Sequence, residues 1–597
     1  MSNLTIYLTT VTSLIFFIYF IPGIALFPKF ILNPRTAAAI PFISISIVVS
    51  GQYLLRILNQ FNHQNVILFI SIFFIIAIYR LFEIYKDRLQ LENTWAKRDC
   101  KALLLIFSSV IPLMIILGFD GFQHADEIMS WNLWAKKIYF NEAKISTGSP
   151  YPLLLPSLIA FCYKFIGNID YQLPIRFTFS IIYISTIFIV FSFSNTKVKA
   201  GLFLITYIIL FLIIGVGYEY KKVWADTLMS GFLVGALALL ISLSNNQQQI
   251  QKDISPFSIL IASVILICCA SLTKQGAIVW TILIYPLLAY VIINNNHKLK
   301  NPIKLVLLAP ILTPILWYFI GGSNFHTNTG VLNRSMGGRD YFEQFLFGFK
   351  ESFLFEGRIV LFLFMMLVFI ILLKRINLEK AIIAFGITLS TIFLIFFGAY
   401  ETTRLYLHMI LTGWLILFAY GDHITTKKIG NMVSKIGNNF YTFTFIGILF
   451  IYWSFTSLSY RLDITDSVSN FLDGREVQVN WVIGASGPEQ YRNILESKQG
   501  LWAKDSHVWG IFYGMTNFRR GEIGFNNSDI QFIIKSLGNE KIGWVYVNKE
   551  NDLDEINKIQ NLCNNSLTEI NTSQNMYKQA LYKVDIDIIQ SCNKLNE

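Results

Sequence analysis

Long apolar runs dominate this chain and limit what it can fold into more than any other feature. About fourteen such runs are roughly 17–25 residues long, and a helix of that length crosses the hydrocarbon core of a bilayer. The mean hydropathy is +0.52 and 54% of the 597 residues are hydrophobic, which is too apolar for a soluble protein of this size. We therefore predict a polytopic α-helical membrane protein. The predicted spans are 6–28, 37–57, 65–85, 102–119, 174–194, 200–217, 226–244, 256–272, 276–293, 304–320, 359–373, 381–398, 405–420 and 440–458.

The basic residues predict which side of the membrane each loop occupies. Lys and Arg gather in short loops, and with about fourteen spans these loops all fall on one side, which the positive-inside rule makes cytoplasmic. They also account for the net charge of +11, so we do not expect nucleic-acid binding. We expect a multi-pass membrane protein. Its extracytoplasmic side would hold the loops 120–156, 218–225, 273–276, 321–358 and 400–404 and the C-terminal tail.

The tail beyond Arg461 is polar, rich in Asn and Lys, and contains no run that could span a membrane. Segments rich in Val, Ile, Tyr and Trp predict strands, and amphipathic segments between them predict helices. This alternation favours a small extracytoplasmic α/β domain. Cys563 and Cys592 both fall within it, and the sequence leaves open whether they pair. The predicted strands are 476–485, 542–551 and 580–588, and the predicted helices are 528–538 and 552–562.

The loop that follows the fourth predicted span carries three carboxylates, Asp120, Asp126 and Glu127. Asp126 and Glu127 suit the start of a helix, as an N-cap and a first-turn acid. Helical spacing then places four apolar residues on one face, with Lys136 and Lys137 off that face. The pattern predicts an interfacial helix that holds the carboxylates just above the bilayer. The four apolar residues are Ile128, Trp131, Ala135 and Ile138.

Two further groups of ionisable residues lie at the extracytoplasmic ends of predicted spans. Glu401, Arg404 and His408 recur at helical spacing and share one face, either as ordinary interfacial charges or as the lining of a cavity. Lys274 is either an exposed turn residue or a second cation that points into the same cavity. Asp226 begins a span, where we interpret it first as a helix cap and second as a site residue.

The loop 321–345 is long, rich in Gly and basic at Arg334 and Arg339. Loops of this kind either are disordered or act as lids and binding segments. No phosphate-cradling motif, zinc-protease motif or serine-hydrolase motif occurs in a suitable context. A pump driven by nucleotide hydrolysis is therefore not expected.

The order of short motifs resembles a known superfamily. An acidic pair after a span is followed by W-N-x-W-A-K, Y-P-L-L-x-P, x-A-D, L-T-K-Q-G and E-x-x-R, and then by an α/β tail. This order resembles the GT-C superfamily of polytopic glycosyltransferases, in particular the branch of protein O-mannosyltransferases and lipid A aminoarabinose transferases. The resemblance covers about 102–458. It implies accessory helices in 1–101, a catalytic membrane core in 102–458 and a soluble domain in 459–597.

The resemblance also implies the reaction. Members transfer a sugar from a polyprenyl-phosphate donor to a glycan, lipid or protein acceptor, with a carboxylate of the first outer loop as the catalytic residue. Asp126 matches that residue first and Glu127 second. Lys274 and Arg404 match basic residues that hold the carrier phosphate. The other substrate- or phosphate-binding candidates are His408, Glu401, Arg334, Arg339, Asp226 and Asp120.

The chemistry requires few groups. A phosphate leaves readily without a general acid, so a carboxylate base and fixed cations suffice. No metal ligands are predicted, and the use of a divalent cation stays open. The sequence departs from the lipid A branch in two places: Tyr-Pro-Leu replaces its Pro-Pro pair, and no R-Y-x-x-P follows Arg404. These departures bear on the identity of the acceptor more than on the reaction. The alternatives are an O-antigen polymerase or ligase and a polyprenol or sugar transporter.

Overall fold

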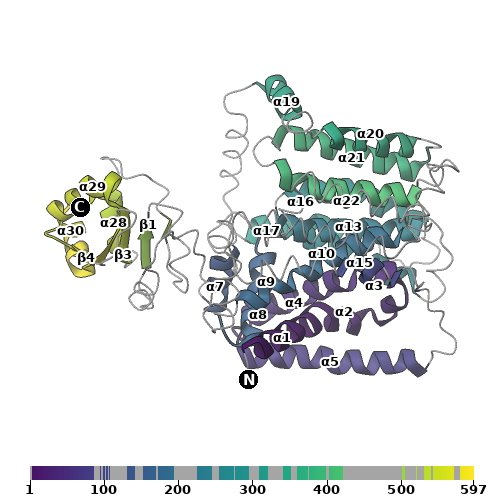
Figure 1. The fold of residues 1–597 in the computed structure, drawn as a ribbon, viewed down its shortest axis with the longest axis horizontal. Helices are drawn as coiled ribbons and strands as arrows, with labels where there is room; N and C mark the ends of the chain where they lie inside the picture. Colours follow the sequence, from purple (N-terminus) through teal and green to yellow (C-terminus); the bar gives the residue numbers. More distant parts are fainter. Residues whose placement is uncertain are drawn as a thin grey trace. The chain divides into compact units, whose positions relative to one another are not determined.

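The computed structural model divides the chain into two compact units, which we describe separately (Figure 1). The first comprises Met1–Gly118, Ala143–Gly167 and Pro174–Thr465, and the second comprises Phe119–Glu142, Asn168–Leu173 and Asp466–Glu597. The predicted boundary between 458 and 459 lies outside the described residues. The structure describes residues 3–86, 95, 99–100, 102–104, 106–107, 131–141, 152–169, 172–193, 225–244, 254–274, 276–294, 308–320, 340–350, 359–373, 376–397, 402–420, 500–503, 519–520, 530–539, 542–570 and 579–596.

The N-terminal part of the first unit forms three long apolar helices, as predicted. They are long and apolar enough to cross a membrane over Thr5–Leu26, Pro34–Ile57 and His63–Lys86. The first consists of α1 (Asn3–Leu14), the π-helical segment η1 (Ile15–Phe20) and α2 (Ile21–Leu26), and the 3₁₀ segment η2 (Pro28–Leu32) follows it. The second consists of α3 (Pro34–Ala37) and α4 (Ile40–Ile57), and the third is α5 (His63–Lys86).

A glycine allows the first two of these helices to pack closely. The backbone N–H of Gly23 donates to the Ser44 hydroxyl over 2.8 Å. A Cβ atom at this position would lie 2.7 Å from the Ile40 carbonyl oxygen, so any larger residue would push α2 away from α4.

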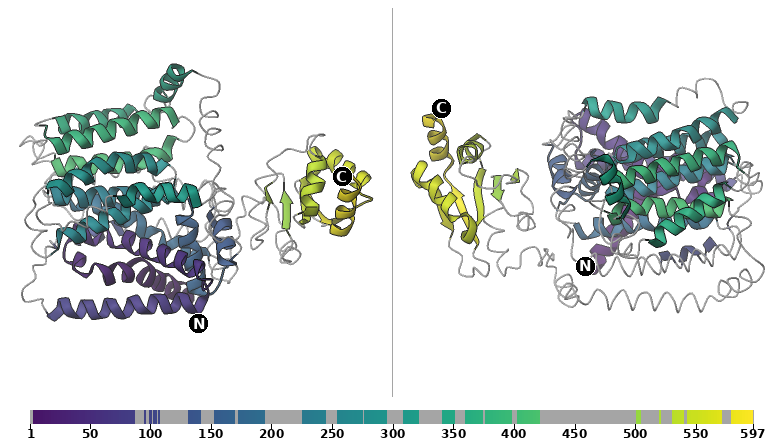
Figure 2. Two further views of the ribbon diagram at one scale, coloured as in Figure 1. Left: turned by 180° about the vertical axis from the view of Figure 1, so that it is seen from behind. Right: turned by 90° about the horizontal axis from the view of Figure 1, so that it is seen from above.

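The helices of the first unit run side by side (Figure 2). Among them, α13 (Ala225–Ser244) is buried almost throughout and packs against neighbours on several sides. Two more segments that could cross a membrane are Pro174–Ser192 and Ala225–Ser244, so the described residues contain five such helices. The predicted number of about fourteen spans stays a prediction. The other helices are α8 (Leu154–Ile166), α9 (Gln172–Thr178), α10 (Ser180–Ser192), α15 (Pro256–Ser271), α16 (Gly276–Asn294), α17 (Ala309–Ile320), α19 (Tyr341–Phe349), α20 (Ile359–Leu373), α21 (Leu378–Phe397) and α22 (Thr402–Tyr420).

Three predicted spans cannot be compared with the structure. Of 102–119, only 102–104 and 106–107 are described, and they are helical. The runs 200–217 and 440–458 lie outside the described residues. Conversely, α8 was not predicted as a helix, and its first residues fall in the predicted loop 120–156; it forms a buried helix that is followed by Gly167 in the left-handed conformation (φ 80°).

A buried carboxylate fixes the relative direction of two central helices. The hydroxyls of Ser244, at the end of α13, and of Tyr420, at the end of α22, both donate to the carboxylate of Glu379 in the first turn of α21. Because α13 and α22 pack together and end at the same carboxylate, they are parallel and also begin at a common end. We call that the Asp226 end of the bundle, and the opposite end the Glu379 end.

The C-terminal part of the second unit is a small mixed sheet with helices, as predicted. The strand order is β2-β1-β3-β5-β4, with β1 parallel to β2 and β3, and β5 antiparallel to β3 and β4. The strands are β1 (Gly500–Ala503), β2 (Arg519–Arg520), β3 (Ile542–Asn548), β4 (Leu567–Ile570) and β5 (Gln579–Val584). The helices are α28 (Ile530–Asn539), α29 (Lys549–Leu562) and α30 (Ile586–Asn596), and α7 (Leu133–Tyr139) also belongs to this unit.

Two predicted strands are too long, and the third, 476–485, lies outside the described residues. The strand predicted at 542–551 ends at Asn548, and α29 begins at Lys549. The strand predicted at 580–588 ends at Val584, because Asp585 starts a new helix. Its carboxylate accepts a hydrogen bond from the backbone N–H of Ile588 over 3.1 Å, which is the geometry of an N-cap.

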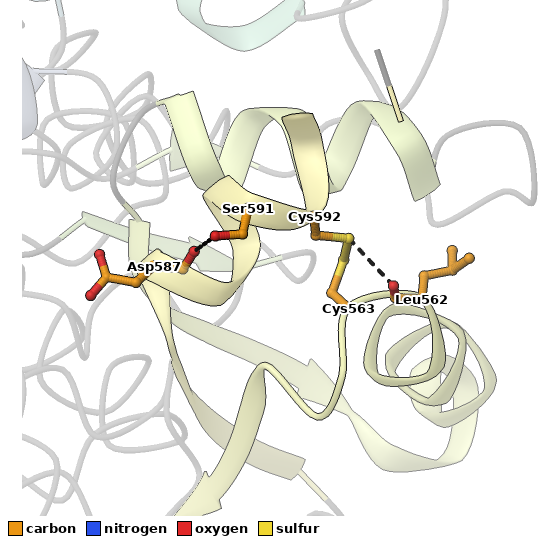
Figure 3. The surroundings of a disulfide bond; sticks show 5 residues. All are labelled: Leu562, Cys563, Asp587, Ser591 and Cys592. Atoms are coloured by element: carbon orange, nitrogen blue, oxygen red, sulfur yellow. Dashed lines mark hydrogen bonds between the residues drawn. A yellow bond between two sulfur atoms is a disulfide. The ribbon is translucent and has the colours of Figure 1, made fainter. Parts of the chain in front are cut away.

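Cys563 and Cys592 form a disulfide, which settles the pairing that the sequence left open. The bond joins the residue that follows α29 to α30 across 29 positions (Figure 3). Both cysteines are buried in the core of this unit, with Ile534, Val545 and Ile559 among its members.

Candidate functional site

Asp226 and Lys274, two of the predicted site residues, form an ion pair at the Asp226 end of the bundle. The Lys274 Nζ lies 2.8 Å from Oδ1 and 2.9 Å from Oδ2 of Asp226, so one ammonium group contacts both carboxylate oxygens. The Asp226 side chain is only 4% exposed, whereas the Lys274 side chain is 18% exposed. Pairing with a cation, rather than the expected capping role, is therefore what the structure shows for Asp226.

The turn that carries Lys274 is fixed by hydrogen bonds after the last residue of α15. The backbone N–H of Leu272 donates to the Cys268 carbonyl over 3.2 Å, and the Thr273 hydroxyl donates to the Cys269 carbonyl over 2.8 Å. Both bonds satisfy carbonyls that the helix would otherwise leave without donors. The turn is thus well defined, and Lys274 is not the exposed turn residue that one interpretation of the sequence allowed.

The same turn contacts the first residue of α8. The Leu154 backbone N–H donates to the Leu272 carbonyl over 3.1 Å. This N–H belongs to the first turn of α8, where it has no partner within its own helix. Three motifs that lie far apart in the sequence therefore meet at the Asp226 end: Y-P-L-L-x-P at 151–156, x-A-D at 224–226 and L-T-K-Q-G at 272–276.

Arg404 and His408 lie in the first two turns of α22. Because α13 and α22 are parallel and share the Glu379 carboxylate at their last residues, the first turn of α22 lies at the same end as Asp226 and Lys274. The structure therefore brings the backbone of the predicted α22 residues to the end that holds the ion pair. Glu401, the third member of that group, lies outside the described residues.

The other predicted site residues lie outside the described part of the chain. These are Asp120, Asp126 and Glu127 of the first large loop and Arg334 and Arg339 of the loop 321–345. Their roles, including that of the predicted catalytic carboxylate, stay predictions.

The segment predicted as an interfacial helix forms the helix α7 over its described part, and its placement at the membrane surface stays a prediction. Trp131, Ala135 and Ile138 are buried, in agreement with the apolar face, and the rings of Trp131 and Trp134 meet edge to face with centroids 5.3 Å apart. Lys136 lies about 140° around the helix from Trp131, off that face as predicted, yet it too is buried, with 3% of its surface exposed. Residues on two different sides of α7 are therefore buried.

Two buried arginines that the sequence reasoning missed lie near the ends of helices in the first unit. Arg176, in α9, is 1% exposed and interacts electrostatically with Tyr7 of α1. Arg56, in the last turn of α4, lies over the Tyr53 ring with its guanidinium carbon 5.4 Å from the ring centroid. An arginine just inside an apolar run is the signal that could have identified both, because such a charge is costly unless the protein uses or pairs it.

The described residues contain no group of three or more His, Cys, Asp or Glu side chains that could hold a metal ion. The chemistry that this part of the chain offers is therefore that of an anchored ammonium group beside a buried carboxylate, close to helix ends that carry further ionisable residues.

No model of a known protein family matches this chain, and no curated protein matches it either.

Proposed function

We propose that the protein is a membrane glycosyltransferase that moves a sugar from a polyprenyl-phosphate donor to a glycan, lipid or protein acceptor. The proposal places the reaction at the Asp226 end of the bundle, on the extracytoplasmic side of a bacterial inner membrane. Its main support is the meeting of three sequence motifs at that end through the Asp226–Lys274 pair and the Leu154–Leu272 hydrogen bond. If these short motifs matched the superfamily by chance, there would be no reason for them to lie close together in the fold.

The pair also suits a role in binding the donor phosphate. An ammonium group has three N–H donors, and the carboxylate of Asp226 fixes the position of Nζ by contacting it with both oxygens. A cation held in place stabilises charge better than one that must first be ordered, because no reorganisation is needed during the reaction. In this proposal Asp226 is a positioning residue that acts through Lys274.

The reaction follows from these roles. The acceptor hydroxyl oxygen attacks the anomeric carbon of the sugar, and the bond between that carbon and the phosphate oxygen breaks. The hydroxyl proton passes to Asp126 or Glu127, and the polyprenyl phosphate leaves with its charge stabilised by Lys274 and Arg404. Neither a general acid nor a nucleotide is needed, since the leaving group is already a phosphate.

The test is sugar transfer in membranes that contain equal amounts of folded protein. Asp126→Asn, Glu127→Gln and the double variant are supplied with a panel of polyprenyl-phosphate-linked hexoses and pentoses, and transfer to endogenous acceptors is measured. We expect a loss of about 10²-fold or more from at least one single variant, which is the usual contribution of a positioned base. Wild-type rates in both single variants and in the double variant would exclude the carboxylate mechanism.

A further inference from the structure

The short helix α19 is a stable element at the Asp226 end of the bundle. Its N-cap, Asp340, accepts a hydrogen bond from the Glu343 backbone N–H over 2.7 Å, and the Glu343 carboxylate accepts one from the Asp340 N–H over 3.4 Å. This reciprocal capping box fixes the first turn. The helix lies beside the ends of α20 and α21 (Figure 1).

The end of the bundle at which α19 lies follows from the chain. α21 begins at the Glu379 end with Leu378, and α20 ends only five positions earlier, at Leu373. α20 therefore begins at the opposite end, which is the Asp226 end. The ring of Phe349, the last residue of α19, meets that of Phe362 in the first turns of α20, edge to face with centroids 5.7 Å apart.

The amphipathicity of α19 is the reverse of what a helix on a soluble protein shows. Gln344 and Gly348, four positions apart, are buried. Tyr341 and Phe342 are each 70% exposed, and Leu346 is 51% exposed. Three large apolar side chains, those of Tyr341, Phe342 and Leu346, are thus turned away from the protein, whereas Gln344 and Gly348 face it. Exposure of such an apolar face to water is unfavourable, so we expect an apolar surface to cover it.

The exposed face of α19 continues an apolar surface that begins on α20. Along α20, four residues at helical spacing are strongly exposed: Leu363, Met366, Leu367 and Ile370. A helix whose hydrophobic residues face outwards in this way presents them to lipid. The Phe349–Phe362 contact joins this lipid-facing surface to α19, so the same bilayer reaches both.

We propose that α19 lies in the lipid–water interface of the bilayer, with the aromatic face formed by Tyr341, Phe342 and Leu346 inserted among lipid chains. The polar residues at its ends suit this position. Asp340, Glu343 and Lys350 are all exposed and remain at headgroup level. An amphipathic helix with aromatic residues on one face and charges beside it is the usual form of an interfacial element. The inference does not depend on sugar transfer.

The experiment places single cysteines on three sides of α19. Exposed Cys100 and half-buried Cys268 are replaced by Ser, and this background, with buried Cys162 and Cys269 and the disulfide, serves as the unlabelled control. Phe342→Cys and Leu346→Cys probe the apolar face, Lys350→Cys the exposed polar side and Gln344→Cys the buried side. Each variant is labelled with a small fluorophore, and the full-length protein is reconstituted in nanodiscs with or without lipids that carry a nitroxide near the headgroup end of the acyl chain.

We expect the probes at 342 and 346 to be quenched several-fold more strongly by the nitroxide lipid than by aqueous iodide. The probe at 350 should show the reverse order, and the probe at 344 should be shielded from both quenchers. Preferential quenching of 342 and 346 by iodide would place the face in water and overturn the proposal. Protection of both positions from both quenchers would also overturn it, because protein rather than lipid would then cover the face.

Discussion

The two ends of the helical bundle use their ionisable groups differently. At the Asp226 end, a carboxylate pairs with Lys274, whose side chain keeps 18% of its surface exposed. At the Glu379 end, a carboxylate that is 3% exposed accepts hydrogen bonds only from neutral hydroxyls among its described contacts, those of Ser244 and Tyr420. The first arrangement leaves part of a cationic side chain exposed, whereas the second joins three helices. The difference suggests that one end carries chemistry and the other end sets helix positions.

The largest effect is expected from breaking the ion pair. Lys274→Ala leaves the Asp226 carboxylate buried without its partner, so we expect the free energy of unfolding to fall by about 3 kcal/mol and sugar transfer to be lost. SDS titration of the protein in mild detergent measures the first, and a membrane transfer assay the second. Asp226→Asn combined with Lys274→Met should cost less than the two single changes together. Strict additivity would show that the pair does not couple.

Removing the carboxylate at the other end separates stability from activity. Glu379→Ala removes the acceptor of the half-buried Tyr420 hydroxyl and leaves the Ser244 hydroxyl only the Ile241 carbonyl oxygen, 3.1 Å away, so we expect a loss of about 2 kcal/mol in unfolding free energy. Glu379→Gln keeps an acceptor oxygen and should lose less. The transfer rate per folded molecule should stay close to that of the wild type in both variants. An inactive but fully folded Glu379→Gln protein would show that this end also takes part in the chemistry.

Two glycines in the middle of the bundle, Gly231 and Gly235, allow a comparison that involves no charged group. A Cβ atom at Gly231 would lie 2.2 Å from the Phe42 ring, so Gly231→Ala forces α13 away from α4 and should cost about 2 kcal/mol. At Gly235 the nearest contact would be a Leu266 methyl at 3.1 Å, which can move, so Gly235→Ala is the matched control with a small effect. Thermal unfolding in detergent distinguishes them. Equal losses in both variants would contradict the packing described for α13.

The smallest effects are expected from single hydroxyls at the Glu379 end. Tyr420→Phe and Ser244→Ala each remove one hydrogen bond to Glu379 but leave the other, so each should cost about 1 kcal/mol. Denaturant titration of the single and double variants measures both values and their coupling. A loss from either change that exceeds the loss from Glu379→Ala would mean that the carboxylate is not the centre of this contact.

The sequence predicted those helices best that are both long and uniformly apolar. The predicted spans 37–57 and 226–244 agree closely with α4 (Ile40–Ile57) and α13 (Ala225–Ser244), because about 20 apolar residues leave a chain few alternatives. It did not predict α8 as a helix, since 13 residues are too few for a span and the first of them fall in the predicted loop 120–156.

The sequence did not predict which residues far apart in the chain are in contact. Asp226 and Lys274 were both singled out, but nothing in periodicity pairs residues 48 positions apart. Glu379 was missed because it stands among basic loop residues, although a lone carboxylate at the start of an apolar helix is a signal. The burial of Lys136 was not predicted, because helical periodicity gives the direction of a side chain but not what covers it.

The disulfide of the tail has a consequence for how the protein matures. Such bonds persist in oxidising compartments, and here both cysteines are buried, with the Cys592 sulfur 3.4 Å from the Leu562 carbonyl oxygen. A reductant can reach them only if α30 detaches from the domain. The redox state of the surroundings therefore acts while α29, β4, β5 and α30 assemble, and the folded tail then protects the bond that has formed.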